Sequence, residues 1–449
     1  MPPLGAPLAQ YSKFNLNPAG VAGFFGGEEA VSAMASVHLY KGRRWLGWYN
    51  APGSGTMAKE FGRIANSRFW DALFPGPNDP PAVVFGLHGK KGPRYIAALS
   101  RMSFQTGHLG YLTMERSKEL NAMKIKGRET LPINVAYLAM KNVDDKVPVK
   151  LLPFKTALWG LIPITVSVVT CVMCSLVYDW FSFSVILAGM ITSGLTSAVI
   201  GEGRLVIESV MRPFAGAPPG HGILIGEDEV VVIKGAEGDV NVITKGRFDL
   251  VMAGAKMRYH AIGLCSLLLL VPVLLQLLLI PQGTFFGQLM FLVSLGVSWV
   301  YNFYLSSLER EKLHTDIFFE ALGSPQMLRF QAGTRTTMAT FVCLLLFHGV
   351  ERSSPEKDRD LRIKILDSCL PNDTVIWRRW KEKVVEQHLN IDDDAGNLPY
   401  LAENGEDQVF LESDRALLRA LLNDAGTAFR EYLDCRGILP DDSSHQKVE

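Results

Sequence analysis

Two long apolar blocks, at 158–200 and 261–305, constrain this chain of 449 residues more than any other feature. A helix needs roughly 20 apolar residues to cross the hydrocarbon core of a bilayer, so each block is long enough for two crossings. A short polar turn divides each block near its middle: Tyr178-Asp179-Trp180 in the first and Pro281-Gln282-Gly283-Thr284 in the second. The sequence therefore predicts a polytopic α-helical membrane protein with two transmembrane helical hairpins.

The four predicted spans are 158–177, 181–200, 261–280 and 285–305. One continuous helix in place of the first hairpin would be about 65 Å long and would carry half of its apolar side chains into water. We therefore favour the hairpin, with Asp179 at its water-facing tip between two interfacial aromatic residues. Pro272 lies inside the third span, where it predicts a kink that membrane helices tolerate.

Basic residues flank the outer ends of both hairpins and are absent from the two turns. They are Lys141, Lys146, Lys150, Lys155, Arg204, Arg212, Lys245, Arg247, Lys256, Arg258, Arg310 and Lys312. Cytosolic loops carry an excess of Lys and Arg, so we expect both termini and the middle segment to lie in the cytosol. Residues 1–20 show neither a secretory signal nor an Arg-rich transit peptide, and insertion is expected to depend on the internal spans.

A fifth apolar stretch at 338–350 offers an alternative topology, since a fifth span would move the C-terminus to the other side. This stretch contains His348 and runs into Glu351-Arg352. It is shorter than the roughly 20 apolar residues that a membrane-spanning helix needs, which favours a buried or interfacial helix. The sequon at Asn372 provides a test, because a glycan there would contradict four spans.

The spans divide the chain into successive segments. The expected organisation is a cytosolic α+β region at 1–150 with loosely ordered residues 1–35, a transmembrane hairpin at 157–200, a cytosolic β-hairpin-containing segment at 201–260, a second transmembrane hairpin at 261–305, a mainly helical cytosolic domain at 306–435 and a disordered tail at 436–449. No internal repeat appears beyond the duplicated hairpin.

Local patterns predict several elements within the N-terminal and middle segments. Residues 57–74 have apolar side chains at every fourth position, which predicts one amphipathic helix, and 82–87 is a candidate strand. Two apolar runs, 221–226 and 230–233, flank an acidic turn and predict a β-hairpin. The residues at 240–244 fit either a strand or a helix, and we favour a helix that ends near Gly246.

The C-terminal segment shows two strong helical patterns, at 374–388 and from Ser413 to Tyr432. Their apolar residues recur at helical spacing, with Trp380 expected to face inward in the first. A segment of this length can enclose a core of its own.

Composition and motifs exclude several functional classes. Lys plus Arg equals Asp plus Glu, at 45 each, so no nucleic-acid partner is expected. The six cysteines are scattered, and the only Cys-x-x-Cys pair, Cys171 and Cys174, lies in an apolar helix where small packing groups are expected. No phosphate-binding loop, nucleophile elbow or zinc motif occurs, so no catalytic, cofactor or metal site is predicted.

One cluster of basic residues is a candidate contact for anionic lipid headgroups or a phosphorylated ligand. It comprises Lys90, Lys91, Arg94 and Arg101. A base near an anionic surface contributes about 1 kcal/mol to binding. The competing interpretation is an ordinary solvated loop.

The predicted spans contain no charged residue, which argues against an ion-conducting site. The second span carries small residues suited to close helix packing: Gly189, Ser193, Gly194, Ser197 and Ala198. Gln276 in the third span and Asn302 in the fourth are the polar intramembrane residues singled out. Expected partners are therefore the lipid bilayer and either a second copy or another membrane protein.

Large cytosolic segments and very short outer turns favour a non-catalytic structural, adaptor or regulatory role. The first alternative is a subunit of an oligomeric channel or transporter that uses Gln276, Asn302 and the small residues of the second span. The second alternative is a membrane-bound enzyme whose site at the cytosolic interface would draw on His88, His108 or Lys90.

Overall fold

The computed structural model describes residues 25–439 apart from 66, 78, 142, 145, 154–156, 210–212, 215, 253–254, 351–353 and 392–409. The chain forms two compact units, each assembled from separate stretches of sequence. The helical unit comprises residues 1–89, 148–207 and 248–321. The sheet unit comprises residues 90–147, 208–247 and 322–449.

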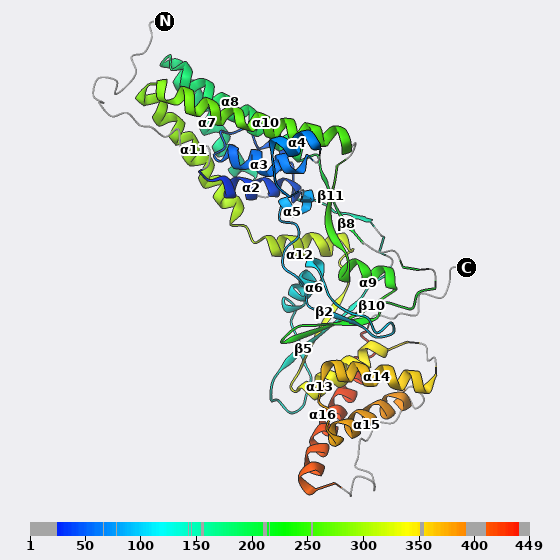
Figure 1. Ribbon diagram of the computed structural model, residues 1–449. Helices are drawn as coiled ribbons and strands as arrows, with labels where there is room; N and C mark the ends of the chain where they lie inside the picture. The colour runs from blue at the N-terminus through cyan, green and yellow to red at the C-terminus, as the bar shows by residue number, and fades with distance from the viewer. Residues whose placement is uncertain are drawn as a thin grey trace. The chain divides into compact units, whose positions relative to one another are not determined.

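The helical unit is built mainly from α-helices (Figure 1). Its helices are α2 (Gly27–Ala35), α3 (Ser54–Ile64), α4 (Arg68–Leu73), α5 (Pro81–Val84), α7 (Leu161–Leu176), α8 (Trp180–Ile200), α10 (Ala255–Leu279), α11 (Phe285–Ser306) and α12 (Arg310–Ala321), with 3-10 turns η1 (Ser36–His38), η2 (Arg43–Trp45), η3 (Ala157–Gly160) and η4 (Ile280–Gln282). Its strands are β1 (Tyr40–Lys41), which pairs in parallel with β7 (Leu152–Pro153), and β8 (Arg204–Glu208), which lies beside β11 (Arg247–Val251).

Four helices of this unit are long and apolar enough to cross a membrane. They cover Leu158–Leu176, Trp180–Ile200, Tyr259–Gln282 and Phe285–Ser306. These bounds match the four apolar helices predicted from the sequence, and α10 continues through Pro272. Within the described residues, no other apolar helix reaches this length.

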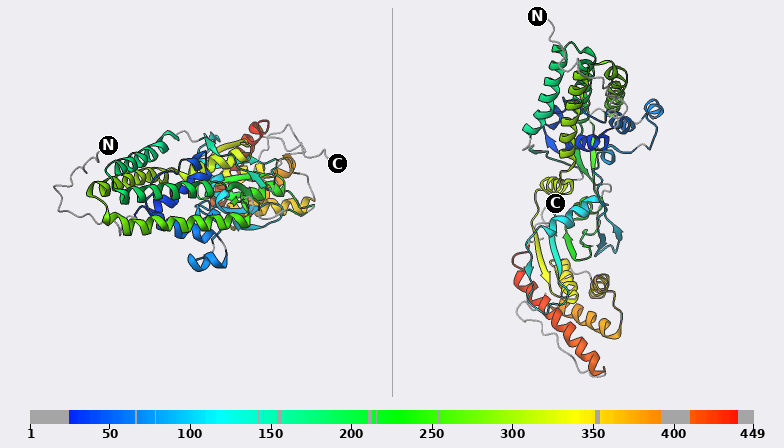
Figure 2. Two further views of the ribbon diagram at one scale, coloured as in Figure 1. Left: turned by 90° about the horizontal axis from the view of Figure 1, so that it is seen from above. Right: turned by 90° about the vertical axis from the view of Figure 1, so that its left-hand side faces the viewer.

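The two helical hairpins pack against each other, because α8 contacts both α10 and α11 while α7 contacts α11. Figures 1 and 2 show these four helices running side by side. Their shared apolar core includes Cys171 and Cys174 of α7, Val185 and Ile186 of α8, and Phe291 of α11. The two cysteines therefore act as small packing groups between helices.

Asp179 corrects one expectation, because it is buried at 2% exposure and does not face water at the hairpin tip. Its carboxylate accepts hydrogen bonds from the Ser182 backbone N–H and hydroxyl, both at 3.1 Å. It also accepts from the Thr284 backbone N–H at 2.8 Å and the Thr284 hydroxyl at 2.7 Å. Asp179 thus joins the two hairpin turns.

Two predictions for the N-terminal region were wrong. The single helix expected at 57–74 is two helices, α3 and α4, because the Ser67 hydroxyl caps a new helix by accepting from the Trp70 backbone N–H. The candidate strand at 82–87 begins as the short helix α5, where Pro81 occupies the first turn and supplies a backbone angle suited to helix initiation. In this unit α2 packs on α11 and α3 packs on α10.

The sheet unit contains a seven-stranded mixed sheet in the order β3-β2-β9-β10-β5-β12-β4. Its strands are β2 (Arg94–Ala97), β3 (Ser103–Gln105), β4 (Met123–Lys124), β5 (Ile133–Ala139), β9 (Gly222–Ile225), β10 (Glu229–Lys234) and β12 (Met327–Ala332). β10 pairs with β5 in parallel and with β9 antiparallel, and β12 joins β5 antiparallel. The predicted β-hairpin is confirmed as β9 and β10.

Helices cover both faces of this sheet, which explains why its central strands are almost entirely apolar. They are α6 (His108–Lys118), α9 (Glu237–Thr244), α13 (Arg335–Phe347), α14 (Pro355–Cys369), α15 (Val375–Ile391) and α16 (Glu412–Cys435). In Figure 1, α13 to α16 lie on one side of the sheet and α6 and α9 lie on the other. The predicted helices around Asn241, Trp380 and Leu421 are confirmed as α9, α15 and α16.

The apolar stretch considered as a fifth span forms α13, which is buried in the core of the sheet unit. It packs on β5 and β10 and against α16. The Trp380 indole N–H donates to the Leu421 carbonyl at 3.0 Å and joins α15 to α16. A helix with buried residues along its whole length belongs to a protein core, so the predicted buried helix is confirmed.

Candidate functional site: a basic pocket in the sheet unit

A pocket of about 340 Å³ lies between the β2–β3 hairpin and α14 in the sheet unit. Its lining residues are Arg94, Ile96, Ala97, Ala98, Arg101, Ser103, Lys364, Ile365, Asp367 and Ser368. The register of the hairpin pairs Arg94 with Gln105 and Ile96 with Ser103. This short hairpin therefore brings two of the four predicted basic residues, Arg94 and Arg101, to one wall, and α14 supplies the opposite wall.

The pocket combines three cations with hydroxyl groups. The Arg94 guanidinium donates from Nε to the Ser103 hydroxyl at 2.6 Å, which orients it along the hairpin. Lys364 adds a cation from α14, a position that the sequence analysis did not single out. The one carboxylate, Asp367, is paired with the Lys381 ammonium at 2.5 Å, so it leaves the three pocket cations unbalanced. A pocket with a net positive charge and several hydrogen-bond donors favours the binding of an anion.

Arg101 adopts a left-handed backbone conformation, with φ of 59°, at the end of the β2–β3 turn. Residues with a Cβ are strained in this region, and glycine or asparagine is the usual occupant. Arginine at this position therefore raises the free energy of the local backbone conformation relative to glycine. Strained residues of this kind occur often at functional sites, where the side chain is needed.

Lys90 and Lys91, the other two predicted contacts, do not line this pocket. The Lys90 ammonium lies 3.4 Å from the Tyr111 hydroxyl and 5.3 Å from the centre of that ring. The structure therefore divides the predicted basic cluster into two places within the sheet unit. Substitutions of Arg94 and Arg101, which line the pocket, can therefore be compared with substitutions of Lys90 and Lys91, which do not.

The small residues of α8 are in contact with the N-terminal segment. A Cβ added at Gly189 would lie 2.1 Å from Asn50 Oδ1, and one added at Gly194 would lie 2.3 Å from the Trp48 ring. Ser197 is close to Gly47, and Ser193 is buried beside it, whereas Ala198 is partly exposed. The Asn50 backbone N–H also donates to the Ser167 hydroxyl of α7 at 3.1 Å.

Gln276 and Asn302 are both buried in the helical unit. Asn302 accepts a hydrogen bond from the Tyr49 hydroxyl at 2.7 Å, while Gln276 Oε1 has no partner within the described residues. Ser294 and Ser298 precede Asn302 on α11 at intervals of four residues and are also fully buried. This polar face of α11 was readable from the spacing, but only Asn302 was singled out.

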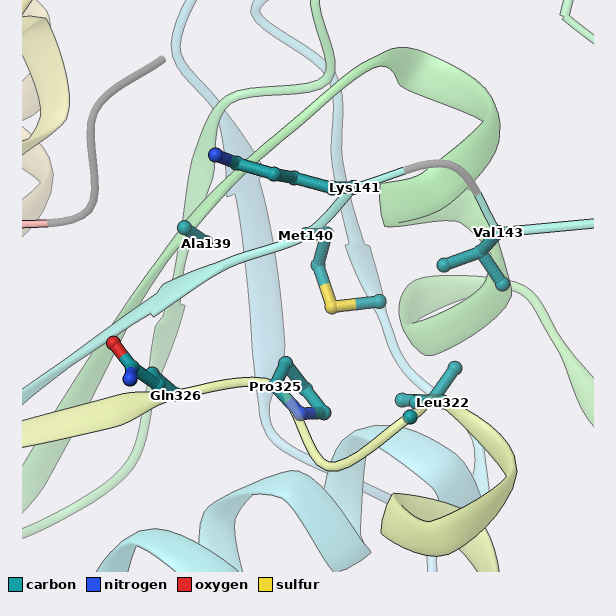
Figure 3. A pocket seen from close by; sticks show the side chains of 8 residues that line it. Ala139, Met140, Lys141, Val143, Leu322, Pro325 and Gln326 are labelled. Carbon is teal, nitrogen blue, oxygen red and sulfur yellow. The ribbon is translucent and has the colours of Figure 1, made fainter. Parts of the chain in front are cut away.

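A second pocket, of about 300 Å³, lies at the carboxyl end of β5 and before the start of β12. Figure 3 shows the side chains of Met140, Leu322 and Pro325 around it, with Lys141 and Gln326 as polar neighbours. Lys141 is the one cation among its eight lining residues, and no arginine lines it. The basic pocket is therefore the better candidate for recognising a charged ligand.

Across the described residues, no group of three or more His, Cys, Asp or Glu side chains is placed to hold a metal ion. Comparison with known proteins gave no further assignment: no protein-family model, curated protein sequence or solved structure matches this chain.

Proposed function

We propose that this chain is an integral membrane protein with four spans and cytosolic termini, and that it acts as a non-catalytic regulatory component. In this proposal the basic pocket of the sheet unit binds a phosphate-bearing ligand. The proposal is supported by four helices of membrane-spanning length and composition. The observation that carries the binding function is the convergence of Arg94, Arg101 and Lys364 on one pocket.

A phosphate group suits this pocket for electrostatic and geometric reasons. A phosphomonoester carries between one and two negative charges at neutral pH and has several strong acceptor oxygens. Two guanidinium groups and an ammonium can donate to these oxygens, and the Ser103 hydroxyl, which accepts from Arg94, can add a neutral hydrogen bond. The volume of the pocket fits a small phosphorylated head but leaves no deep apolar cleft for a large ligand.

The spanning topology is tested with terminal tags on the full-length protein in sealed membranes. We expect alkaline carbonate to leave the protein in the membrane fraction, because its four apolar helices would be in lipid. Protease added from the outer side should spare both tags, and permeabilisation should expose both. Cleavage of one tag alone, or a glycan at Asn372, would contradict four spans.

Binding is tested with the full-length protein in neutral detergent, using soluble inositol trisphosphate in one arm. A second arm uses phosphatidylcholine vesicles that contain a phosphorylated phosphatidylinositol. Replacing Arg94, Arg101 and Lys364 together with Gln should weaken binding at least about a hundredfold, since each charge-assisted hydrogen bond contributes about 1.5–3 kcal/mol. Binding in the first arm indicates a soluble ligand, and binding confined to vesicles indicates a lipid headgroup.

The matched control replaces Lys90 and Lys91 with Gln, which removes nearby cations that do not line the pocket. We expect less than about a threefold change, because exposed charges beyond direct contact are screened by salt. Equal losses from both sets of substitutions would show diffuse surface attraction and would contradict a defined site. Absence of binding in both arms would also reject the proposed ligand.

Two substitutions at Arg101 distinguish the effect of this residue on ligand binding from its effect on stability. Arg101→Gly should weaken binding about tenfold while leaving the unfolding free energy unchanged or raised by up to about 1 kcal/mol, because glycine relieves the left-handed strain. Arg101→Ala removes the charge but keeps the strain, so it should weaken binding without the gain in stability. Unfolding in denaturant measures the free energy of unfolding of each variant.

A further inference from the structure

The N-terminal segment places a buried arginine inside the helical unit. Arg43 lies in η2 and is only 2% exposed. Its Nη2 is 3.4 Å from the Tyr49 hydroxyl, and its guanidinium lies 5.4 Å from the centre of the Tyr301 ring. Tyr49 in turn donates to Asn302 and packs edge-on against Tyr301 at 5.7 Å. These contacts join the N-terminal segment to α11.

Five buried polar atoms of Arg43 and of residues 298–302 on α11 can donate hydrogen bonds but have no partner among the described residues. They are Arg43 Nε and Nη1, Asn302 Nδ2 and the hydroxyls of Ser298 and Tyr301. Ser298 lies one turn before Tyr301 and Asn302 on α11. We call Arg43, Tyr49, Ser298, Tyr301 and Asn302 the Arg43 site. Donors buried in this way need an acceptor to offset their desolvation.

No carboxylate within the described residues forms an ion pair with Arg43. The residues of the helical unit that the structure does not describe cannot supply one either, because 1–24, 66, 78, 154–156 and 253–254 include no Asp or Glu. Its polar contacts instead are two tyrosines, Tyr49 and Tyr301, which are neutral, and Tyr49 links it to the neutral Asn302. A buried guanidinium without a counter-charge is strongly unfavourable, so an anion from outside the unit is the expected complement.

The Tyr301 hydroxyl packs closely against Gly160, where only a residue without a side chain fits. A Cβ added at Gly160 would lie 2.9 Å from this oxygen. Arg44, next to Arg43, stacks on Trp45 with its guanidinium 4.8 Å from the ring centre, so its charge has an aromatic partner at the partly exposed edge. The two adjacent arginines therefore differ in role, and only Arg43 is buried.

We propose that the Arg43 site binds a small oxyanion, a carboxylate or a phosphate, between the N-terminal segment and α11. Arg43 supplies the charge, and Ser298, Tyr301 and Asn302 supply neutral donors. A free solute and the head of an acidic lipid present the same oxygens, and the experiment distinguishes these two sources. This site lies in the helical unit and does not depend on the basic pocket of the sheet unit.

The experiment uses the full-length protein with Arg94, Arg101 and Lys364 already replaced by Gln, so that the basic pocket does not contribute. Calorimetry measures binding of inorganic phosphate and acetate in neutral detergent, and native mass spectrometry measures retention of phosphatidic acid. Arg43→Gln should weaken anion binding at least about tenfold. Arg44→Gln, the adjacent control, should change it less than about twofold.

Asn302→Asp provides a second variant if Arg43→Gln fails to fold. The new carboxylate keeps an acceptor for Tyr49 and supplies an internal counter-charge for Arg43, so it should abolish anion binding while preserving the fold. Anion binding that survives both Arg43→Gln and Asn302→Asp would overturn the proposal. So would the absence of phosphate, acetate and phosphatidic acid binding when Arg43 and Asn302 are intact.

Discussion

Replacing Asp179 with Ala is expected to lower the unfolding free energy of the helical unit by about 3–5 kcal/mol. Asp179 caps the N-terminus of α8 and also bonds Thr284, the residue that caps α11. One carboxylate therefore lies at the positive ends of two helix dipoles and accepts four hydrogen bonds. Its removal leaves buried donors unsatisfied in both hairpin turns.

Thermal unfolding of the full-length protein in detergent measures this effect, and a midpoint lowered by about 10 °C corresponds to such a loss. Asp179→Asn should give an intermediate value, because asparagine is a good cap but carries no charge. An unchanged midpoint for Asp179→Ala would show that the two turns are held together by other contacts.

Two glycines of α11 supply a matched test of the same turn. A Cβ added at Gly287 would lie 1.9 Å from Asp179 Oδ2, whereas nothing lies within 4 Å of one added at Gly296. We expect Gly287→Ala to displace the carboxylate and destabilise the protein. Gly296→Ala should be neutral or stabilising by up to about 1 kcal/mol, because alanine has the higher helix propensity.

Acidification from pH 7 to pH 4 is expected to remove about 3 kcal/mol of stability through His38 alone. Burial lowers the pKa of His38 from 6.5 to about 4. The unfolded chain therefore binds a proton that the folded chain does not bind between these two values. Stability from this group is complete above pH 6.5 and falls as the pH decreases toward 4.

His38→Gln isolates this contribution, because glutamine does not titrate and other groups are unchanged. The ring of His38 packs edge-on against Phe85 at 4.8 Å, so some constant loss of stability is expected in the variant at every pH. Denaturant unfolding at several pH values should show a steeper loss for the unmodified chain than for the variant. Parallel curves would mean that the pKa of His38 is the same in the folded and unfolded chains, which would contradict the prediction.

The sequence predicted the four long helices well because their cause is local. An apolar run of about 20 residues indicates a long helix from its own composition, and a short polar turn indicates where the chain reverses direction. The β9–β10 hairpin and α16 were predictable for the same reason, since their periodicity is contained in neighbouring residues. Local capping by Ser67 was missed, and the helix expected at 57–74 is consequently two helices.

The sequence indicated only some of the residues that line the candidate sites. Arg94 and Arg101 belong to one hairpin and line one pocket, whereas Lys90 and Lys91 do not line it and Lys364 comes from α14. Asn302 was singled out as a polar residue in an apolar helix. Arg43 was not, because a charged residue outside the apolar blocks looks exposed until its neighbours are known.

The amino-acid sequence by itself determined which stretches become long apolar helices, where they turn back and which strands form a hairpin, since these depend on side-chain spacing over a few residues. The tertiary structure alone decided that strands from residues 94–139, 222–234 and 327–332 share one sheet, and that Asp179 and Arg43 are buried. The physical reason is that burial and charge compensation depend on contacts between residues distant in sequence, which local periodicity does not encode.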